Sequence, residues 1–260
     1  MKNKKIKSLA PALDKGLDVI EFLASSGLSH TLSQIAKGLH RSVSEIQRTL
    51  TSLASRGYLV RDHLGGFRLS SKLFSIAHNH PPHRDLLSVA LPVMQQFSHH
   101  TEQSVHLSAP VGLDLIIVAQ TESPTRARIT IQNGLVLDPF TTTSGRVYLA
   151  FLPESTRAAL MKSTPLPSNQ KKTLTESIEK IQKTKFFSSP SHYYDGVTDM
   201  AAPILSLSTQ QVQAVLATTW IHPLGKKIDT TLLLNQLLKA VHAVENAWEE
   251  SIIDQPSSKK

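Results

Sequence analysis

The stretch SVSEIQRTLTSLASRGYL, residues 42–59, has the pattern of a helix with one apolar side and one polar side. Ser42 and Glu45 have the spacing of a capping box, which marks a helix start, and Gly57 is placed to end the helix. The apolar side repeats at intervals of three and four residues and consists of Val43, Ile46, Leu50 and Leu53. Because these side chains are expected to face a core, the polar side is expected to face solvent or a partner.

The neighbouring segments predict a small domain of three helices and a hairpin. Thr31 and Gln34 form a second capping box, which opens a short helix over residues 31–39. Residues 58–71 alternate about Gly65 and Gly66, as in a two-stranded hairpin. An earlier helix over residues 10–24 is predicted from Leu9, Leu13, Leu17, Ile20 and Leu23. This order predicts a winged helix-turn-helix, whose third helix enters the DNA major groove while the hairpin contacts the backbone beside it.

The polar side of the 42–59 helix supplies candidates for reading DNA. Helical spacing turns Ser44, Gln47, Arg48 and Thr51 away from the apolar stripe, toward base edges and phosphates. Simpler explanations stay open, because Arg48 could be a solvated charge and the cap accounts for Glu45. The complete set of candidate DNA-contacting residues is Arg41, Ser42, Ser44, Gln47, Arg48, Thr51, Arg61 and Arg68.

The charge of the chain is concentrated in its first third. The formal net charge is +8, and residues 1–80 hold 12 Lys or Arg against 5 Asp or Glu, whereas the remaining residues hold 16 against 15. A local basic excess suits a polyanion such as DNA, because each neutralised phosphate releases counterions. The alternative is a solubilising surface with a disordered lysine tail.

Composition excludes several other classes of protein. The 260 residues contain no cysteine, which excludes disulfides, thiol nucleophiles and thiolate metal sites. No apolar run approaches the 18 residues of a membrane span, and Asp14, Lys15 and Asp18 interrupt the start where a signal peptide needs an apolar stretch. We therefore expect a cytoplasmic protein with no membrane partner.

The remainder of the chain predicts a second domain. A short helix over residues 71–77 ends before Pro81 and Pro82, which places a linker at 71–84 between a DNA-binding domain at 1–70 and a domain at 85–260. Helices are expected at 85–99, 144–152, 175–185 and 230–251, and strands at 104–110, 114–121, 128–134 and near Met200 and Val215. The first of these helices is expected to bury Leu86, Leu87, Leu91, Met94 and Phe97. This mixture predicts an α+β domain with one central sheet.

Hydroxyl side chains at residues 141–144 precede the helix expected at 144–152. A helix start presents free N–H groups and a partial positive charge, so this position can bind an anion. The alternative is that Ser144 only caps the helix. Asp199 is either a polar group of a pocket or an exposed strand residue.

The chain resembles the IclR-type bacterial transcriptional regulators. The resemblance rests on LSQIAKGLHRSVSEIQRTLTSLASRGYLVRDHLGGFRLSSKLFSIA, on LVLDPFTTTSGRVYLAFLP, and on YYDGVTDMAAPIL followed by QVQAVLATTWI, and it covers roughly residues 9–250. It implies an N-terminal winged helix-turn-helix, a C-terminal GAF-like mixed α/β domain that binds an effector, and assembly as a homodimer or homotetramer. The residues implied for the effector site are Phe140, Thr143, Ser144, Gly145, Asp199, Ala217 and Thr219.

This sequence departs from the family pattern at both sites. Many members carry Ser-Thr shortly before the helix arginine, where Glu45 and Ile46 or their neighbours stand here. Some members place a cysteine at the position of Asp199 and an acid at that of Ser189. Two hydroxyls of the last strand correspond to Ala217 and Thr219, of which only the second is a hydroxyl here. The ligand is therefore expected to differ.

The sequence gives little support for metal binding, cofactor binding or catalysis. His78, His80 and His83, or the pair His99 and His100, lack metal-site spacing, and no cysteine can complete a tetrahedral site. No nucleophile elbow, phosphate loop or dinucleotide fingerprint is present, so neither a cofactor nor catalysis is expected. The predicted function is a transcriptional regulator whose promoter binding responds to a small molecule, an organic acid or aromatic metabolite. Two alternatives stay open: a C-terminal domain that serves only oligomerisation, and an enzyme with a degenerate DNA-binding appendage.

Overall fold

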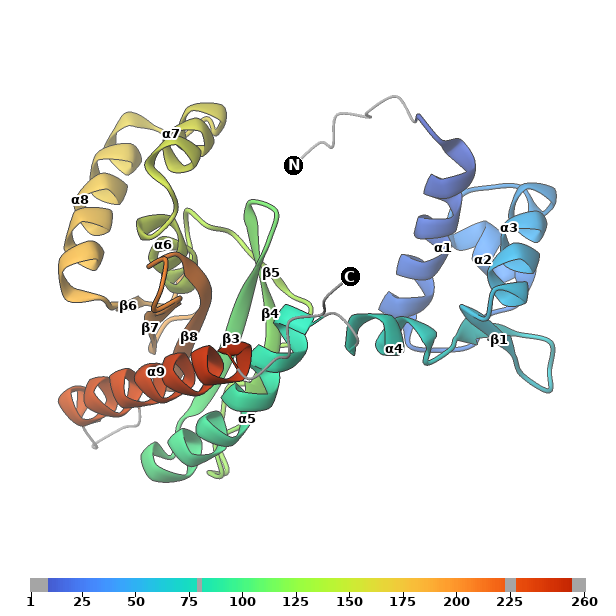
Figure 1. The fold of residues 1–260 in the computed structure, drawn as a ribbon. Coiled ribbons are helices and arrows are strands. Elements are labelled where there is room, and N and C mark those ends of the chain that lie inside the picture. Colours follow the sequence, from blue (N-terminus) through green and yellow to red (C-terminus); the bar gives the residue numbers. More distant parts are fainter. Residues whose placement is uncertain (1–8, 79–80, 223–227, 254–260) are drawn as a thin grey trace. The chain divides into compact units, whose positions relative to one another are not determined.

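The computed structural model describes residues 9–78, 81–222 and 228–253 (Figure 1). The chain divides into two compact units, Met1–Arg84 and Asp85–Lys260. Each unit is described by itself.

The first unit is a winged helix-turn-helix, as the sequence predicted. Its elements are α1 (Pro11–Ser26), α2 (Leu32–Gly38), α3 (Val43–Ser55), β1 (Leu59–Arg61), β2 (Phe67–Leu69) and α4 (Lys72–His78). The two strands pair antiparallel, with Leu59 opposite Leu69 and Arg61 opposite Phe67. The core that joins helices and hairpin consists of Val19, Leu23, Ile35, Ala36, Ile46, Leu50, Leu59 and Phe67.

Local capping determines where α3 begins and ends. The Ser42 hydroxyl accepts from the backbone N–H of Glu45 at 3.3 Å, and the Glu45 carboxylate accepts from the backbone N–H of Ser42 at 3.1 Å. Gly57 follows the helix at φ +77°, a left-handed conformation that favours glycine, and its N–H bonds the carbonyl of Ala54. Both ends are therefore specified locally, and the helix turns Ile46 and Leu50 into the core.

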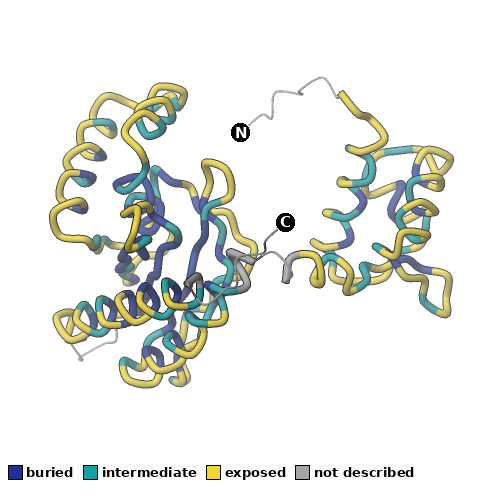
Figure 2. Tube along the Cα trace, in the orientation of Figure 1, coloured by how far each residue is buried: buried dark blue, intermediate teal, exposed yellow. Residues whose placement is uncertain are grey.

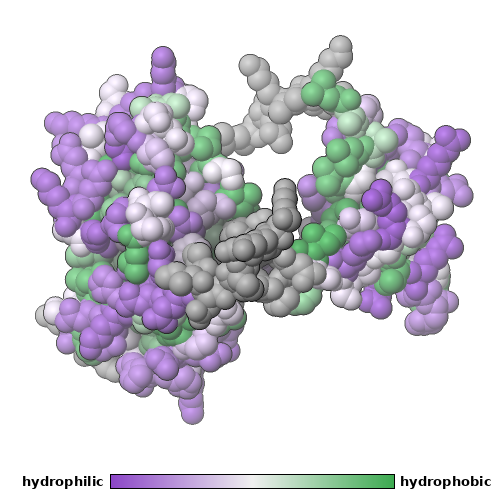
Figure 3. Space-filling view, viewed as in Figure 1, coloured by the Kyte–Doolittle hydropathy of each residue, from purple (hydrophilic) through white to green (hydrophobic). Residues whose placement is uncertain are grey.

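Some residues predicted to belong to the apolar stripes are exposed. Val43 is 45% exposed because it lies in the first turn of α3, beyond the core. Leu13 and Leu17 are 62% and 46% exposed, since α1 buries the face of Val19 and Leu23 instead. The space-filling view shows the resulting apolar surface along α1 (Figure 3).

The second unit is built on one antiparallel sheet of six strands in the order β5-β4-β3-β8-β7-β6. The strands are β3 (Ser104–Val111), β4 (Asp114–Thr121), β5 (Val136–Leu137), β6 (Phe187–Pro190), β7 (Val197–Leu205) and β8 (Val212–Ile221). The helices are α5 (Pro81–Thr101), α6 (Thr143–Ala150), α7 (Glu154–Ser163), α8 (Ser168–Thr184) and α9 (Thr230–Ile253). This arrangement confirms the predicted mixed α/β domain.

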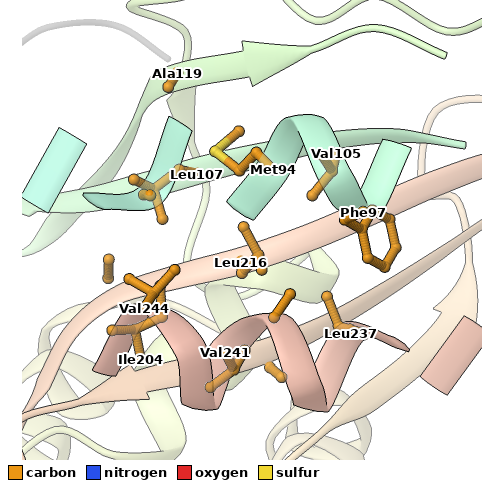
Figure 4. Close-up of a cluster of buried hydrophobic side chains, with 14 of the residues drawn as sticks. Met94, Phe97, Val105, Leu107, Ala119, Ile204, Leu216, Leu237, Val241 and Val244 are labelled. Atoms are coloured by element: carbon orange, nitrogen blue, oxygen red, sulfur yellow. The ribbon is translucent and has the colours of Figure 1, made fainter. Parts of the chain in front are cut away.

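Helices cover both faces of the sheet, and the strands between them are the most buried part of the unit (Figure 2). Helices α5 and α9 pack on one face, where Met94 and Leu237 meet Leu216 of β8 (Figure 4). Helices α6 and α8 pack on the other face, against residues such as Ala201 and Ala217. Because successive strand residues point to opposite faces, each central strand contributes to both cores.

The sequence predictions were wrong at several positions in this unit. Residues 128–134 form no strand: the N–H of Ile131 bonds the side-chain Oε1 of Gln120 at 2.5 Å instead of a backbone carbonyl. Helix α8 begins earlier than predicted, after Pro167, where no side chain caps it. Leu91 of α5 is exposed rather than buried. Elements α7 and β6 were not anticipated.

The helix that starts the second unit begins with the two prolines that were expected to interrupt the chain. Pro81 and Pro82 lie in the first turn of α5. A missing N–H removes no helical hydrogen bond there, because the helix has no carbonyl four residues earlier to accept one. Within the described ranges, no helix is long and apolar enough to cross a membrane.

Replacing the fully buried Ile46 by alanine is expected to lower the free energy of unfolding of the first unit by about 2–5 kcal/mol, because it leaves a cavity under α3. Val43→Ala, on the same helix but exposed, is the matched control, with an expected effect below about 1 kcal/mol. Urea unfolding followed by far-ultraviolet circular dichroism measures the change. Tryptophan fluorescence, which reports Trp220 and Trp248 of the second unit, should keep its midpoint. Equal effects of the two variants would contradict this packing.

Candidate functional sites

The outer side of α3 presents two unengaged long polar side chains. Gln47 and Arg48 are exposed, and neither side chain makes a hydrogen bond or ion pair within the described part of the chain. Thr51 instead donates to the carbonyl of Gln47 at 2.9 Å, and the hydroxyls of Ser42 and Ser44 lie 3.2 Å apart. Gln47 and Arg48 are therefore the side chains of this helix best placed to reach a partner.

The three other arginines predicted to contact DNA differ in how far their side chains are engaged within the unit. Arg41 pairs with Asp18 of α1 at 2.8 Å, so its guanidinium is partly engaged inside the unit. Arg61 packs over the Phe67 ring at 4.6 Å. Arg68, opposite Val60 in the hairpin, is exposed with no such contact. Arg68 is thus free to contact a partner, whereas Arg61 packs on the Phe67 ring of the hairpin.

In the second unit, the sheet register brings polar residues distant in sequence into one row. Ser189 of β6 lies opposite Asp199 of β7, Asp199 opposite Thr219 of β8, and Thr219 opposite Ser104 of β3. The next row on the same face consists of Phe187, Ala201, Ala217 and His106. These rows lie on the face that α6 covers, since Ala201 and Ala217 pack in the α6 core. Asp199, Ala217 and Thr219 are therefore brought together.

The first turn of α6 faces these rows. Its cap is Thr142, whose hydroxyl accepts from the N–H of Gly145 at 3.0 Å, so Ser144 is not the cap. The Thr143 hydroxyl lies 2.8 Å from that of Ser189, and the Ser144 hydroxyl lies 3.5 Å from Nε2 of His106. The backbone N–H groups of Thr143 and Ser144 have no partner among the described residues. The first turn of α6 therefore holds hydrogen-bond donors that the described residues do not use.

Gly145 has a structural reason to be glycine. A Cβ atom there would lie 2.5 Å from the carbonyl oxygen of Asp138 and 2.5 Å from Cα of Pro139, both backbone atoms that cannot yield cheaply. Gly145 therefore lets the start of α6 pack against the preceding loop. This packing accounts for the residue without a ligand.

Two ionisable groups, the buried His106 and the half-buried Asp199, determine the electrostatics of the cluster. Burial lowers the pKa of His106 to about 4, so this imidazole is neutral at pH 7. Burial raises the pKa of Asp199, against the opposing effect of hydrogen bonds from Thr219, at 2.7 Å, and Ser191. His106 was not predicted as a site residue. A signal for it was present, because side chains alternate along a strand, so His106 points to the opposite face of the sheet from Val105 and Leu107.

The half-buried residues at the β6 side of the cluster include Phe140, Arg146 and Phe187. The guanidinium of Arg146 lies over the Phe187 ring at 5.6 Å, and its Nε donates to the carbonyl of Phe140 at 3.4 Å. Arg146 was also missed by the sequence analysis. No sequence signal distinguishes it from an exposed arginine one turn into a helix.

The structure describes only some of the histidines that were considered as metal ligands. His80 lies outside the described residues, and the side chains of His78 and His83 are not described. Across the side chains that the structure describes, no three His, Asp or Glu residues converge as metal ligands.

His106 makes a pH-dependent contribution to stability. Because its pKa in the folded state, about 4, is below the ordinary 6.5, its contribution is complete above about pH 6.5 and is lost as the pH falls toward 4. We expect His106→Gln to reduce the loss of unfolding free energy between about pH 7.5 and pH 4 by about 3 kcal/mol. Urea unfolding followed by tryptophan fluorescence measures it, with the exposed His192→Gln as control. The same pH slope in all three proteins would contradict a buried neutral imidazole.

Comparison with known proteins identifies both units. The family described as "IclR helix-turn-helix domain" matches residues 12–63, and "Bacterial transcriptional regulator IclR C-terminal" matches residues 80–246. The HTH-type transcriptional repressor AllR of Escherichia coli strain K12 is 23% identical over 202 residues, covering 75% of this chain and 74% of the relative. AllR of Salmonella typhi is 25% identical over 158 residues, covering 60% and 58%.

Solved structures show the same fold. An IclR transcriptional regulator from Alicyclobacillus acidocaldarius superposes with a TM-score of 0.75 at 19% identity, covering 93% of this chain and 100% of the other. An IclR homolog from Microbacterium hydrocarbonoxydans, complexed with 4-hydroxybenzoate, has a TM-score of 0.79 at 19% identity and covers 92% and 99%. Because the family matches span both units, this chain belongs to the IclR family of bacterial transcriptional regulators.

Proposed function

We propose that this regulator binds promoter DNA through α3 and the β1–β2 wing, and that a small-molecule effector bound between α6 and the sheet modulates this binding. Residues 1–70 would hold the DNA-binding surface, 71–84 the linker, and 85–260 the effector-binding and oligomerisation domain. The observation that carries the proposal is the polar cluster between the first turn of α6 and the sheet, which includes His106, Thr143 and Ser144.

Part of the cluster lacks short hydrogen bonds within the described chain. Burying polar groups costs free energy unless good hydrogen bonds replace those to water. Here the contact between Ser144 and His106 is long, at 3.5 Å, and the α6 N–H groups lack partners among the described residues. A ligand that bonds these groups would remove the cost.

The cluster extends over one turn of α6 and two rows of the sheet. Its implied residues come from α6, the loop before it, β7 and β8. The Microbacterium homolog is complexed with 4-hydroxybenzoate, an aromatic acid. By analogy, we propose an organic acid or aromatic metabolite as the effector class.

Regulation would follow from linkage between the two sites. If effector and DNA favour different arrangements of the subunits, each weakens the binding of the other by the same factor. A homodimer or homotetramer would read two half-sites, so that a change in the separation of its winged domains alters the fit. The exposed Leu13 and Leu17 of α1 support such assembly, because a second subunit could cover them. We place this activity in the cytoplasm, with the DNA.

Arg48→Ala is expected to weaken binding to operator DNA by roughly 1–3 kcal/mol, about fivefold to 150-fold, while the fold stays intact. The loss should arise because the residue is exposed on the outer side of α3 and supports no packing. Gel shifts at physiological salt, with fragments from upstream of this gene and the adjoining operons, measure it. Arg126→Ala, which removes an exposed arginine from the second unit, is the matched control. Unchanged affinity of the Arg48 variant would refute its assignment.

Ser144→Leu is expected to abolish the effector response and to leave DNA binding in place, because a leucine side chain would fill the space beside His106. The response is the change in operator affinity when metabolites are added to the gel shift. Ser155→Leu, at an exposed position of α7, should respond like the parent protein. If the Ser144 variant still responded, the effector site would have to lie elsewhere.

A further inference from the structure

Two half-buried charges of opposite sign border the α6 cluster, and neither has a charged partner. The guanidinium of Arg146 contacts the Phe187 ring and the Phe140 carbonyl, and no carboxylate lies within ion-pair distance of it among the residues that the structure describes. The carboxylate of Asp199 accepts hydrogen bonds from Thr219 and Ser191, and no positive charge of the described chain offsets its burial.

Both charges lie beside the β6–β7 strand pair. Arg146 lies one helical turn after Thr143, whose hydroxyl contacts Ser189, and Ser189 is the cross-strand partner of Asp199. Phe187, under the Arg146 guanidinium, precedes Ser189 by two residues on the same face. Since a strand rises about 3.3 Å per residue, Phe187, which the Arg146 guanidinium covers, lies about 7 Å along β6 from Ser189, the strand neighbour of Asp199.

Unpaired charges in partly desolvated positions are unfavourable, and each is stabilised by an opposite charge. The burial of Arg146 lowers its pKa and that of Asp199 raises its pKa, which are the directions expected when no opposite charge is near. A carboxylate ligand alone would pair with Arg146 but would be repelled by Asp199. An amine ligand alone would pair with Asp199 but would be repelled by Arg146.

We propose that the effector of this chain is a zwitterion of the α-amino-acid class, with its carboxylate on Arg146 and its ammonium group on Asp199. The inference rests on the proposed function, in that it takes the α6 cluster to be the effector site. Phe187, which is half-buried beside Arg146, would contact the ligand side chain. Planar, bidentate pairing suits Arg146 to a carboxylate.

Ligands that differ in one charge test the proposal directly. The full-length protein is titrated, by calorimetry and thermal shift, with the twenty L-amino acids and with matched sets. One set is L-phenylalanine, 3-phenylpropionate and phenethylamine, and another is L-leucine, 4-methylpentanoate and isopentylamine. Any amino acid that binds is then compared with its own deaminated and decarboxylated counterparts. We expect at least one amino acid to bind about tenfold or more tightly than both counterparts, because each counterpart leaves one charge unpaired.

Charge-neutralising variants assign the two contacts. Asp199→Asn should reduce the preference for the amino acid over its deaminated acid to within about threefold, and Arg146→Gln should do the same for the preference over the amine. Glu176→Gln and Arg126→Gln, which remove exposed charges of the same sign elsewhere in the second unit, should keep the full preference. Retained preference in both cluster variants would overturn the assignment.

The outcomes separate this inference from the proposed function. If no amino acid binds, or if a deaminated acid binds as tightly as the amino acid, the zwitterion is wrong. The effector site itself would still stand if that acid changed the operator affinity and Ser144→Leu abolished the change. If neither acids nor amino acids act on the parent protein, both proposals fail.

Discussion

The alternation of side chains along the central strands is the constraint on which the second unit depends. Val105 and Leu107 of β3 point toward α5 and α9, whereas His106 between them points toward α6. The sheet therefore supports an apolar core on each face, and the α6 face also carries the polar groups of the cluster. A shift of one residue in the register would exchange the two sets, so the site is held by the same pairing that holds the fold.

The first unit depends on a comparable local constraint. Ser42 and Glu45 cap α3 reciprocally and Gly57 follows its end, so the bounds of the helix are set by hydrogen bonds within a few residues. Burial of Ile46 then leaves Gln47 and Arg48 on the outer side. Contacts with α1 and the wing decide which of the remaining basic residues stay free, as the pair of Arg41 with Asp18 shows.

The α6 cluster carries features of the family and features of this chain. Of the residues implied by the family resemblance, Thr143 and Ser144 contact Ser189 and His106 of the sheet, and Thr219 bonds Asp199. In this chain the acid stands at Asp199 on β7 rather than at Ser189 on β6, while Arg146 stands half-buried near the same strand pair. The chemistry proposed for the effector follows from this redistribution of charge.

The sequence by itself determined the elements whose signals are local: the capping boxes of α2 and α3, the glycine hairpin, and the long amphipathic helices. It also grouped Ser144, Asp199 and Thr219, through family resemblance rather than physics. Only the tertiary structure decided that Thr142 caps α6, that residues 128–134 form no strand, and that His106 and Arg146 join the cluster. The reason is that burial and cross-strand pairing join residues up to about a hundred positions apart, such as His106 and Ala217, which no local pattern records.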